Sequence, residues 1–320
     1  MTGGSGLLGS WLLRALVKNG ARVVTLTRSQ TTEAVDEGHS ENIQRILGSV
    51  TDGETIRDAV STYSVETIFH LAAQSLVGSA NDDPANTLDV NIRGTWNVLE
   101  ASRATRKCQV LVASSAKIYG DRSAVPGLYQ EDESHGNHPY EVSKSCADLI
   151  TRMYGETYGL PVTSLRFVNI FGGGDLNFSR IIPGAIRAAL NNEKFVIRGS
   201  GTATRDYLYV EDAIGGCLLL AEKMTLDPHI CGQAFNFGLE RKISVLEIVE
   251  AISRITGRPD LKPVMPAIPS EGDREIFVHT EKARRILNWS PKFAIEDGLR
   301  ASIQWYSKYC NQERYYPVPS

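Results

Sequence analysis

Thr2-Gly3-Gly4-Ser5-Gly6-Leu7-Leu8-Gly9 decides how we expect this chain to fold. Its glycines follow the spacing GxxGxxG, a helical run over residues 8–18 begins at once, and an apolar strand over residues 22–27 comes next. Glycine allows a tight turn and lets a pyrophosphate approach the helix N-terminus, where unpaired amides and the helix dipole favour anions. We therefore interpret this stretch as a dinucleotide-binding turn, not as a glycine-rich tail. The residues expected at the cofactor are Gly3, Ser5, Gly6 and Gly9.

The sequence before this loop is short. A phosphate-binding loop normally follows a buried strand that is central in the doubly wound order, yet only Met1 stands before Thr2. We expect either that translation begins upstream, which we favour, or that the protein has lost an element on which its cofactor site depends.

Short β-branched runs alternate with helical patterns up to about Phe167. This alternation predicts an α/β protein with a doubly wound parallel sheet, the Rossmann fold. Val110-Leu111-Val112-Ala113 is apolar throughout, as expected for a strand that is covered on both faces. The strands are expected at residues 22–27, 67–72 and 109–114, and the clearest helices at residues 86–102 and 140–158.

The sequence pattern changes after Phe171, where glycine-rich turns, arginine-bearing loops and shorter elements are expected. We expect residues 1–170 to form an NAD(P)-binding Rossmann domain that lacks its first strand. Residues 171–320 are expected to form mainly a smaller C-terminal substrate-binding lobe, with segments that return to the Rossmann domain. Because no internal repeat or low-complexity linker separates them, we expect the two parts to share one body.

Bulk composition narrows the class of partner. Lys and Arg total 34 against 37 Asp and Glu, so no net basic field exists to hold a nucleic acid or an anionic membrane. Five widely spaced cysteines without a CxxC pair argue against a disulfide framework and a zinc site. No charged-then-apolar leader opens the chain, and no apolar run approaches the roughly 20 residues that span a bilayer. We expect a cytoplasmic protein that binds a small molecule, with no metal, nucleic acid or membrane partner.

The end of the strand over residues 22–27 bears on the choice of cofactor. An acidic residue there would accept hydrogen bonds from the ribose hydroxyls of NAD, whereas an arginine pairs with the 2′-phosphate of NADP. The sequence reads Leu26-Thr27-Arg28-Ser29, with no carboxylate. Charge alone favours NADP, but Arg28 could equally be solvated or stack on the adenine, so we expect NAD(P) and leave the choice open.

Tyr140 and Lys144 lie four residues apart at the start of an expected helix, so their side chains share one face. A tyrosine with an ordinary pKa of about 10 must lose roughly 3 units to act as a base near neutrality. A neighbouring ammonium supplies part of that shift by favouring the phenolate. The pair gains specificity from chain order, because Ser114-Ser115-Ala116-Lys117-Ile118-Tyr119-Gly120, at the end of a buried strand, lies between the glycine loop and the pair.

This combination of motifs resembles the extended short-chain dehydrogenase/reductase superfamily, specifically its NAD-dependent epimerase/dehydratase family of nucleotide-sugar enzymes, over nearly the whole chain. Further markers are His70-Leu71-Ala72-Ala73-Gln74, Asn91-Ile92-Arg93-Gly94-Thr95, Arg166-Phe167-Val168-Asn169, Arg205-Asp206-Tyr207 and Leu287-Asn288-Trp289-Ser290-Pro291. The resemblance implies that Ser115 hydrogen-bonds the sugar hydroxyl being oxidised, that Tyr140 removes its proton, and that Lys144 also holds the nicotinamide ribose. Hydride then passes from sugar C4 to the cofactor. The residues implied to line the cofactor are Leu71, Ala72, Ala73 and Asn91, with Tyr140 and Lys144.

Asn169, Arg180 and Arg205 lie on expected loops after the sheet, where a nucleotide diphosphate needs neutral donors and cations. Together with Gln74 and Ser115 they are our candidate substrate-binding residues. A surface arginine is usually just solvated. The family match around Arg205 favours phosphate contact there, whereas for Arg180 both interpretations stay open.

Within the family, Gly172-Gly173-Gly174-Asp175 and Ala73-Gln74-Ser75-Leu76-Val77 look most like CDP-glucose 4,6-dehydratases, and GDP-mannose 4,6-dehydratases are more distant. In those dehydratases an Asp follows the catalytic Ser or Thr and helps expel the C6 hydroxyl, and a Lys or Glu comes next. Here Lys117 matches the CDP-glucose type, whereas Ala116 matches 4-epimerases, which need no acid. We expect a nucleotide-sugar 4,6-dehydratase with Lys117 among its catalytic residues, and a 4-epimerase is the first alternative.

The second alternative is a non-catalytic NAD(P)-binding sensor or scaffold. Such a protein has no need for Ser115, Tyr140 and Lys144 together, which speaks against it. Relatives of this kind commonly dimerise through two long helices in a four-helix bundle. We therefore expect a homodimer in which residues 86–102 and 140–158 form the contact.

Three further residues are expected to have structural roles. His70 has no partner at metal-ligand spacing and lies at a strand end, so we expect a packed or hydrogen-bonded histidine and assign it no chemistry. Tyr119 and Gly120 are expected to serve the turn that positions Ser115, although Tyr119 could also flank the sugar.

Overall fold

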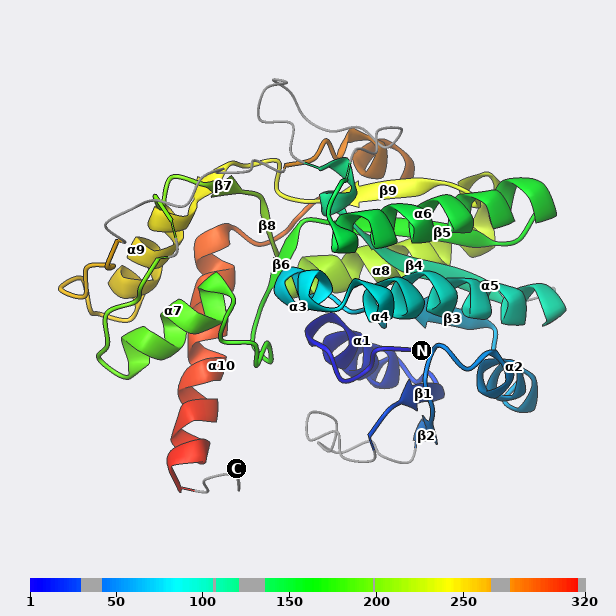
Figure 1. Ribbon diagram of the computed structural model, residues 1–320, viewed down its shortest axis with the longest axis horizontal. Helices are drawn as coiled ribbons and strands as arrows, with labels where there is room; N and C mark the ends of the chain where they lie inside the picture. Colours follow the sequence, from blue (N-terminus) through cyan, green and yellow to red (C-terminus); the bar gives the residue numbers. More distant parts are fainter. Residues whose placement is uncertain (30–41, 106–107, 121–135, 198, 266–276, 316–320) are drawn as a thin grey trace.

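The computed structural model describes residues 1–29, 42–105, 108–120, 136–197, 199–265 and 277–315. Figure 1 shows a twisted sheet with helices on both faces, joined on one side to a smaller group of helices. The strands of the sheet are β1 (Val23–Thr27), β2 (Ile43–Leu47), β3 (Thr67–His70), β4 (Gln109–Ser115), β5 (Val162–Phe167) and β9 (Ala234–Phe237). All neighbouring pairs among them run parallel, so the prediction of an α/β Rossmann fold is confirmed.

The sheet has the strand order β2-β1-Thr2-β3-β4-β5-β9. Thr2 bridges in parallel to Leu26 on one side and to His70 on the other. The Met1 carbonyl oxygen accepts from Leu26 N at 3.0 Å, and Thr2 N donates to the Phe69 carbonyl oxygen at 3.0 Å. Met1 and Thr2 therefore hold the central position that the doubly wound order gives to the strand before the glycine loop.

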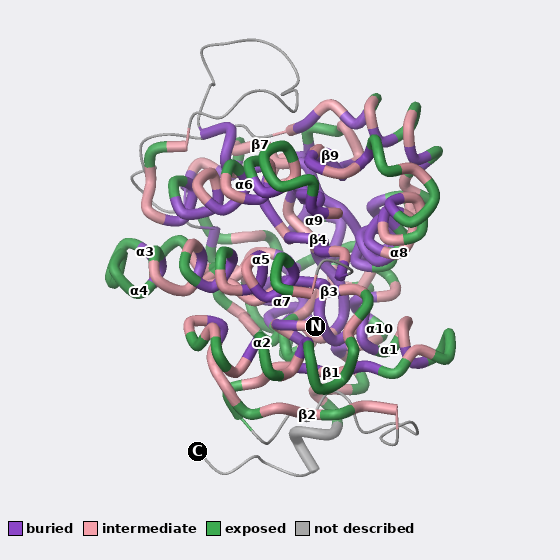
Figure 2. The backbone as a smooth tube through the Cα atoms, turned by 90° about the vertical axis from the view of Figure 1, so that its right-hand side faces the viewer, coloured by how far each residue is buried: buried purple, intermediate pink, exposed green. Residues whose placement is uncertain are grey.

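Helices cover both faces of the sheet. One face packs against α2 (Gly53–Thr62), α5 (Gly94–Thr105) and α6 (Pro139–Tyr158), and the other against α1 (Leu7–Lys18) and α8 (Val210–Leu226). Burial on both sides explains why β4 and β5 are apolar or small along most of their length. Figure 2 shows the buried segments gathered in this interior and the exposed ones on the outer turns of the helices.

The expected helix over residues 86–102 is divided in three. It consists of α4 (Pro84–Leu88), a π-helical turn (Asp89–Arg93) and α5. A short helix, α3 (Val77–Asp82), precedes it. Single π-turns of this kind are frequent at functional sites, because the extra residue redirects the side chains of one turn.

The smaller lobe is built from α7 (Ile181–Leu190), α9 (Val245–Ile255) and α10 (Ile295–Tyr315), which pack on one another (Figure 1). Two short strand pairs connect it to the sheet. They are β6 (Asn169–Phe171) with β8 (Tyr207–Tyr209), and β7 (Thr204–Arg205) with β10 (Ile243–Ser244). Because β9 pairs with β5, the chain returns to the main sheet after entering this lobe.

A buried ion pair fixes α6 against the sheet. Arg166 on β5 donates to both carboxylate oxygens of Asp148 on α6, at 3.0 and 2.6 Å, and each side chain is 2% exposed. The same guanidinium donates to the Tyr119 hydroxyl, which donates in turn to Asn236 Oδ1. This network ties the middle of α6 to β5 and to the turn that follows β4.

Candidate functional site

A cavity of about 930 Å³ opens at the carboxyl ends of the parallel strands, between the sheet and the smaller lobe. Ligands of open α/β sheets bind at this edge, because the loops that leave the strands converge there. Its wall combines the glycine loop, the ends of β1 and β4, the start of α6, and the loops of the smaller lobe.

The glycine loop fits a dinucleotide phosphate. A Cβ on Gly9 would lie 1.9 Å from the Gly3 carbonyl oxygen, and Gly3 itself has a φ of +74° and lies against the backbone of Ala72. A Cβ on Gly6 would meet only the Gly3 oxygen, at 3.6 Å, so the loop leaves open space at this position. Gly6 caps α1 without a side-chain hydrogen bond, which leaves amides of the first turn available to an anion.

The loop after β3 forms the next part of the wall. Leu71, Ala72, Ala73 and Gln74 all line the cavity. Asn91 is buried behind them and is absent from the lining. Its Oδ1 accepts from Gln74 N at 2.8 Å and its Nδ2 donates to the Gln74 carbonyl oxygen at 3.1 Å. Asn91, expected at the cofactor, therefore braces the loop that lines the cavity.

Ser115, Tyr140 and Lys144 meet in the same cavity. Ser115 ends β4, and the other two lie one turn apart at the start of α6, where Pro139 occupies the first helical turn. All three are buried. The Lys144 ammonium donates to the Ala113 carbonyl oxygen at 2.7 Å, which fixes the lysine beside the strand.

Burial is the largest influence on the pKa values of Tyr140 and Lys144. It raises the pKa of Tyr140, while the hydrogen bond from Ser115 and the positive charge of Arg180 act in the opposite direction. Burial lowers the pKa of Lys144 to about 8, against the attraction of Asp148. Arg180, 40 positions along the chain, thus adds a positive charge that acts on the phenol, a contribution that the spacing of Tyr140 and Lys144 could not reveal.

The two residues after Ser115 point in different directions. Ala116 is 1% exposed and belongs to the apolar core. Lys117 lines the cavity, and its Nζ lies 5.5 Å from the centre of the Tyr140 ring. The side chain that a proton-transfer step could use at this point is therefore the lysine.

The loops of the smaller lobe contribute Asn169, Arg180 and Arg205 to the wall. Arg180 donates to Asp175 Oδ2 at 2.8 Å and to Ser75 Oγ at 3.2 Å, so it connects the two parts of the molecule across the cavity. This explains why its sequence context alone left both interpretations open.

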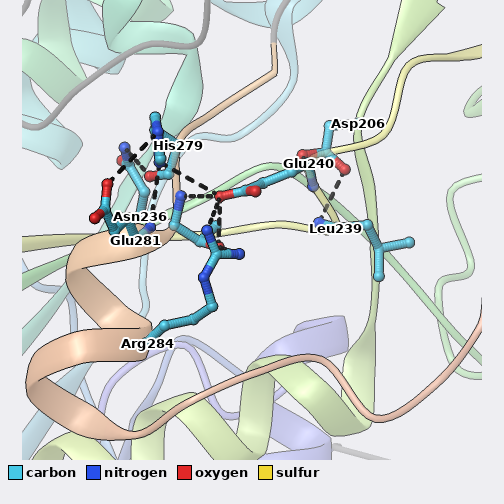
Figure 3. A network of polar contacts seen from close by, with 8 residues as sticks. Asp206, Asn236, Leu239, Glu240, His279, Glu281 and Arg284 are labelled. Atoms are coloured by element: carbon cyan, nitrogen blue, oxygen red, sulfur yellow. Dashed lines mark hydrogen bonds and ion pairs between the residues drawn. The ribbon is translucent and has the colours of Figure 1, made fainter.

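A polar network supports the segment that carries Arg205 (Figure 3). The carboxylate of Asp206 accepts from the backbone amides of Leu239 and Glu240, each at 3.0 Å. The Glu240 carboxylate then binds Arg284 at 3.1 Å. The Asp206 carbonyl oxygen in turn accepts from Asn169 Nδ2 at 3.3 Å. The network lies behind the wall and positions two of the candidate substrate residues.

The structural roles expected for three residues agree with the contacts. His70 is 2% exposed, its ring nitrogens bind the hydroxyls of Thr2 and Thr95 at 2.8 and 3.2 Å, and burial lowers its pKa to about 3. Tyr119 is buried and bonded to Asn236, away from the cavity wall. Gly120 ends the turn after Ser115 with a φ of +67°.

No helix in the described part of the chain is both long and apolar enough to cross a bilayer. Within the same residues, no three His, Cys, Asp or Glu side chains group in a way that would hold a metal ion.

Residues 1–238 match the family model described as NAD dependent epimerase/dehydratase family. The chain is 27% identical to CDP-glucose 4,6-dehydratase of Salmonella typhimurium, over 98% of this chain and 91% of that protein. The crystal structure of UDP-glucose 4-epimerase with UDP-glucose from Thermotoga maritima superposes with a TM-score of 0.87 at 28% identity, covering 97% of this chain and 98% of that one. The crystal structure of dTDP-glucose 4,6-dehydratase from Bacillus anthracis in complex with NAD superposes with a TM-score of 0.84 at 26% identity. The match covers 96% of this chain and 95% of that one.

Proposed function

Because the chain belongs to the NAD-dependent epimerase/dehydratase family, we propose that it oxidises the C4 hydroxyl of a hexose that is linked to a nucleoside diphosphate. The observation that carries this proposal is the convergence of Ser115, Tyr140 and Lys144 with the glycine loop in one cavity. A binding-only protein would have no use for this set. The expected cofactor is NAD(P), and the expected substrate a nucleotide-diphosphate sugar.

The residues that would hold the cofactor follow the wall of the cavity from one end to the other. They are Gly3, Ser5, Gly6 and Gly9 at the pyrophosphate, Arg28 at the adenosine ribose, Leu71, Ala72 and Ala73 along the loop after β3, and Tyr140 and Lys144 at the nicotinamide ribose. When bound, the nicotinamide supplies the hydride acceptor that oxidation at C4 requires.

In the first step Tyr140 takes the proton of the C4 hydroxyl. The hydrogen bond from Ser115 favours the phenolate and also orients the sugar oxygen, and Arg180 adds a positive charge nearby. Lys144 contributes a second cation, held in place by the Ala113 carbonyl oxygen. The product of this step is a 4-keto sugar.

We infer 4,6-dehydration as the reaction that follows, with Lys117 as the proton carrier. The C4 ketone acidifies the proton on C5. The Lys117 ammonium protonates the C6 hydroxyl, which leaves as water, and the amine that results takes the C5 proton. The product would be completed by hydride return to C6 and by return to C5 of the proton that Tyr140 took from the C4 hydroxyl. The position of Lys117 in the cavity, beside the Tyr140 ring, supports this assignment.

A 4-epimerase is the second candidate, and a different observation favours it. Ala116 provides no acid, and the described carboxylates in the cavity wall, Asp89 and Asp175, are both ion-paired, to Arg93 and Arg180. An epimerase needs no acid, because it returns hydride to the opposite face of the keto sugar.

The mass of the product separates the candidates. Purified protein is incubated with CDP-, UDP-, dTDP- and GDP-hexoses, and we expect a product that is lighter by one water. Lys117→Met should lower the rate of water loss by about 10²-fold or more, while C4 oxidation continues. Tyr140→Phe should suppress oxidation itself by a similar factor. A product of unchanged mass with inverted C4 would assign the epimerase, and no keto sugar or epimer from any hexose would contradict both.

We propose that the substrate lies across the two parts of the molecule, residues 1–170 and 171–320. Gln74 and Ser115 reach it from the first part, and Asn169, Arg180 and Arg205 from the second. Guanidinium groups suit the diphosphate because they are always charged and donate in a fork. The five cysteines, none of them in a disulfide, suit a reducing compartment such as the cytoplasm.

We also propose a homodimer. The neighbouring helices α5 and α6 expose large apolar side chains on their outer faces, which is unusual for a surface that meets only water. These side chains are Trp96, Val142, Leu149 and Met153. Two copies facing each other through these helices would form the expected four-helix bundle.

A further inference from the structure

A chain of buried hydrogen bonds begins at the base of the glycine loop and runs behind the cavity wall. The Thr2 hydroxyl accepts from Ala72 N at 3.2 Å and contacts His70 Nδ1 at 2.8 Å. The other ring nitrogen of His70 lies 3.2 Å from Thr95 Oγ1 on α5. The Thr95 hydroxyl donates to the Asn91 carbonyl oxygen at 2.7 Å, inside the π-turn. The chain therefore joins segments that lie far apart in sequence.

The side chain of Asn91 continues this chain to the first turn of α6. Its Nδ2 donates to Ser143 Oγ at 2.9 Å, and the Ser143 hydroxyl donates to the Tyr140 carbonyl oxygen at 2.7 Å. The same Asn91 amide holds both backbone groups of Gln74. Each side chain in the chain has at most 4% of its surface exposed, and these are Thr2, His70, Asn91, Thr95 and Ser143. Each donor depends on the acceptor beside it, since burial makes an unpaired polar group costly.

The directions of these bonds fix the proton on His70. Thr95 has one hydroxyl proton, and its shorter contact, 2.7 Å to the Asn91 carbonyl oxygen, uses that proton. The Thr95 oxygen then accepts at its 3.2 Å contact, so His70 carries its proton on Nε2. Nδ1 is bare and accepts from the Thr2 hydroxyl. Burial, together with the positive charge of Lys144, lowers the pKa of His70 to about 3 and so keeps the ring neutral, as this arrangement requires.

We propose that His70 and Thr95 are positioning residues for Tyr140, which they hold in register with a dinucleotide on the glycine loop. This role rests on the C4 oxidation proposed above, and it adds two residues that act through others and not on the substrate. Thr2 directly precedes Gly3 of the loop, so the chain connects the loop to the backbone of Tyr140. Oxidation at C4 requires the phenol and the nicotinamide in a fixed relative position, and a displacement of about 1 Å costs about 10²-fold in rate.

Thr95→Val tests this role, because valine has nearly the shape of threonine and lacks the hydroxyl. We expect kcat for C4 oxidation to fall about tenfold, with the KM of the sugar and the Kd of the dinucleotide within about threefold of the wild type. The substrate is whichever of CDP-, UDP-, dTDP- and GDP-glucose the wild type oxidises. Thr95→Ser keeps the hydroxyl and should return kcat to within about threefold.

Thr151→Val is the matched control. Thr151 on α6 is 1% exposed, its hydroxyl donates to the Ala147 carbonyl oxygen at 2.8 Å, and it lies outside the described cavity wall. The substitution thus removes the same kind of buried bond without touching the chain, and it should leave kcat unchanged. An equal loss of kcat in Thr151→Val and Thr95→Val would reduce the effect to general destabilisation and overturn the proposed role.

A double variant tests whether the chain acts as a unit. Ser143→Ala removes the last side chain before Tyr140 and should lower kcat about as much as Thr95→Val. The two substitutions together should cost little more than either alone, because both interrupt the same chain. Losses that multiply would overturn the shared chain.

The proton on His70 is measured without any sugar by ¹⁵N NMR of the histidine rings, since a bare ring nitrogen and an N–H differ widely in chemical shift. His70→Gln identifies the signal among those of the six histidines. We expect a bare Nδ1 and a protonated Nε2, unchanged between about pH 5 and about pH 9. Thr95→Val should populate both tautomers, because Nε2–H loses its acceptor.

The outcomes separate this role from the proposed function. A proton on Nδ1 or a charged His70 ring in the wild type would overturn the role, and so would an unchanged kcat in Thr95→Val. A wild type that oxidises none of the nucleotide hexoses would contradict the proposed function instead, and the His70 spectrum would still decide whether the chain of bonds exists.

Discussion

Lys144 lies in the second turn of α6 with 6% of its surface exposed, and its ammonium donates to the Ala113 carbonyl oxygen. Burial lowers its pKa from an ordinary value of 10.5 to about 8. Since one pKa unit corresponds to about 1.4 kcal/mol, keeping this lysine charged at neutral pH costs the fold about 3 kcal/mol. The hydrogen bond to Ala113 recovers about 1 kcal/mol of that.

Lys144→Met should therefore stabilise the protein without cofactor by about 2 kcal/mol at pH 7, while it abolishes turnover. The folded-state pKa lies below the unfolded one, so the penalty is complete below about pH 8 and disappears as the pH rises towards 10.5. Urea unfolding at pH 7 and at pH 10 measures both values. Lys18→Met, at an exposed lysine of α1, is the control and should change little at either pH. If Lys144→Met stabilised the protein as much at pH 10 as at pH 7, the lowered pKa of Lys144 could not be the cause.

At the scale of the element, the glycine loop before α1 meets two requirements, a tight backbone turn and room for a ligand. Different glycines of the loop meet them. Gly9 is needed for the turn itself, because a Cβ there would lie 1.9 Å from the Gly3 oxygen. Gly6 has room for a Cβ and a φ of −78°, which any residue adopts. The lack of a side chain at Gly6 therefore matters only for a ligand that enters the cavity.

Gly9→Ala should lower the free energy of unfolding by about 2–3 kcal/mol, as overpacked sites do. Gly6→Ala should stay within about 1 kcal/mol of the wild type yet weaken dinucleotide binding about tenfold or more, because its methyl group occupies the approach of the pyrophosphate. Urea unfolding and dinucleotide titration of both variants measure the contrast. Equal stability of the two variants would show that the loop is looser than its contacts indicate.

At the scale of the whole molecule, the cavity exists only because the smaller lobe folds back over the strand ends. Trp11 on α1 donates to the Gly173 carbonyl oxygen at 2.7 Å, and Arg180 reaches Ser75, so both contacts tie the lobe to the sheet. The outer face of α5 and α6 lies away from this junction, on the side of the sheet opposite α1 and α8.

Leu149→Glu should dissociate the proposed dimer, raising its dissociation constant by about 10²-fold, because it places a charge in an apolar contact. Sedimentation velocity over a range of concentrations measures the change. Leu226→Glu is the matched control, since Leu226 is an even more exposed leucine at the end of α8, on the opposite face. A wild-type protein that sediments as a monomer at all concentrations would rule out this contact.

The sequence by itself determined what depends on neighbours along the chain. Short apolar strands, the glycine spacing and the helix over residues 139–158 follow from local rules, so the Rossmann fold and the pairing of Tyr140 with Lys144 on one helix face were predictable. The end of β4 at Ser115 was equally visible, because a buried strand must stop where polar residues and a turn begin.

Only the tertiary structure decided the contacts between distant segments. Arg180 acts on Tyr140, Asn91 braces Gln74 from behind, and Asp206 anchors the strand that bears Arg205. The π-turn that divides the expected helix over residues 86–102 belongs to the same class, because it places Asn91 against the loop after β3. Such contacts carry no periodic signal, since their energy arises when two segments far apart in sequence are packed together, and neither segment alone specifies its partner.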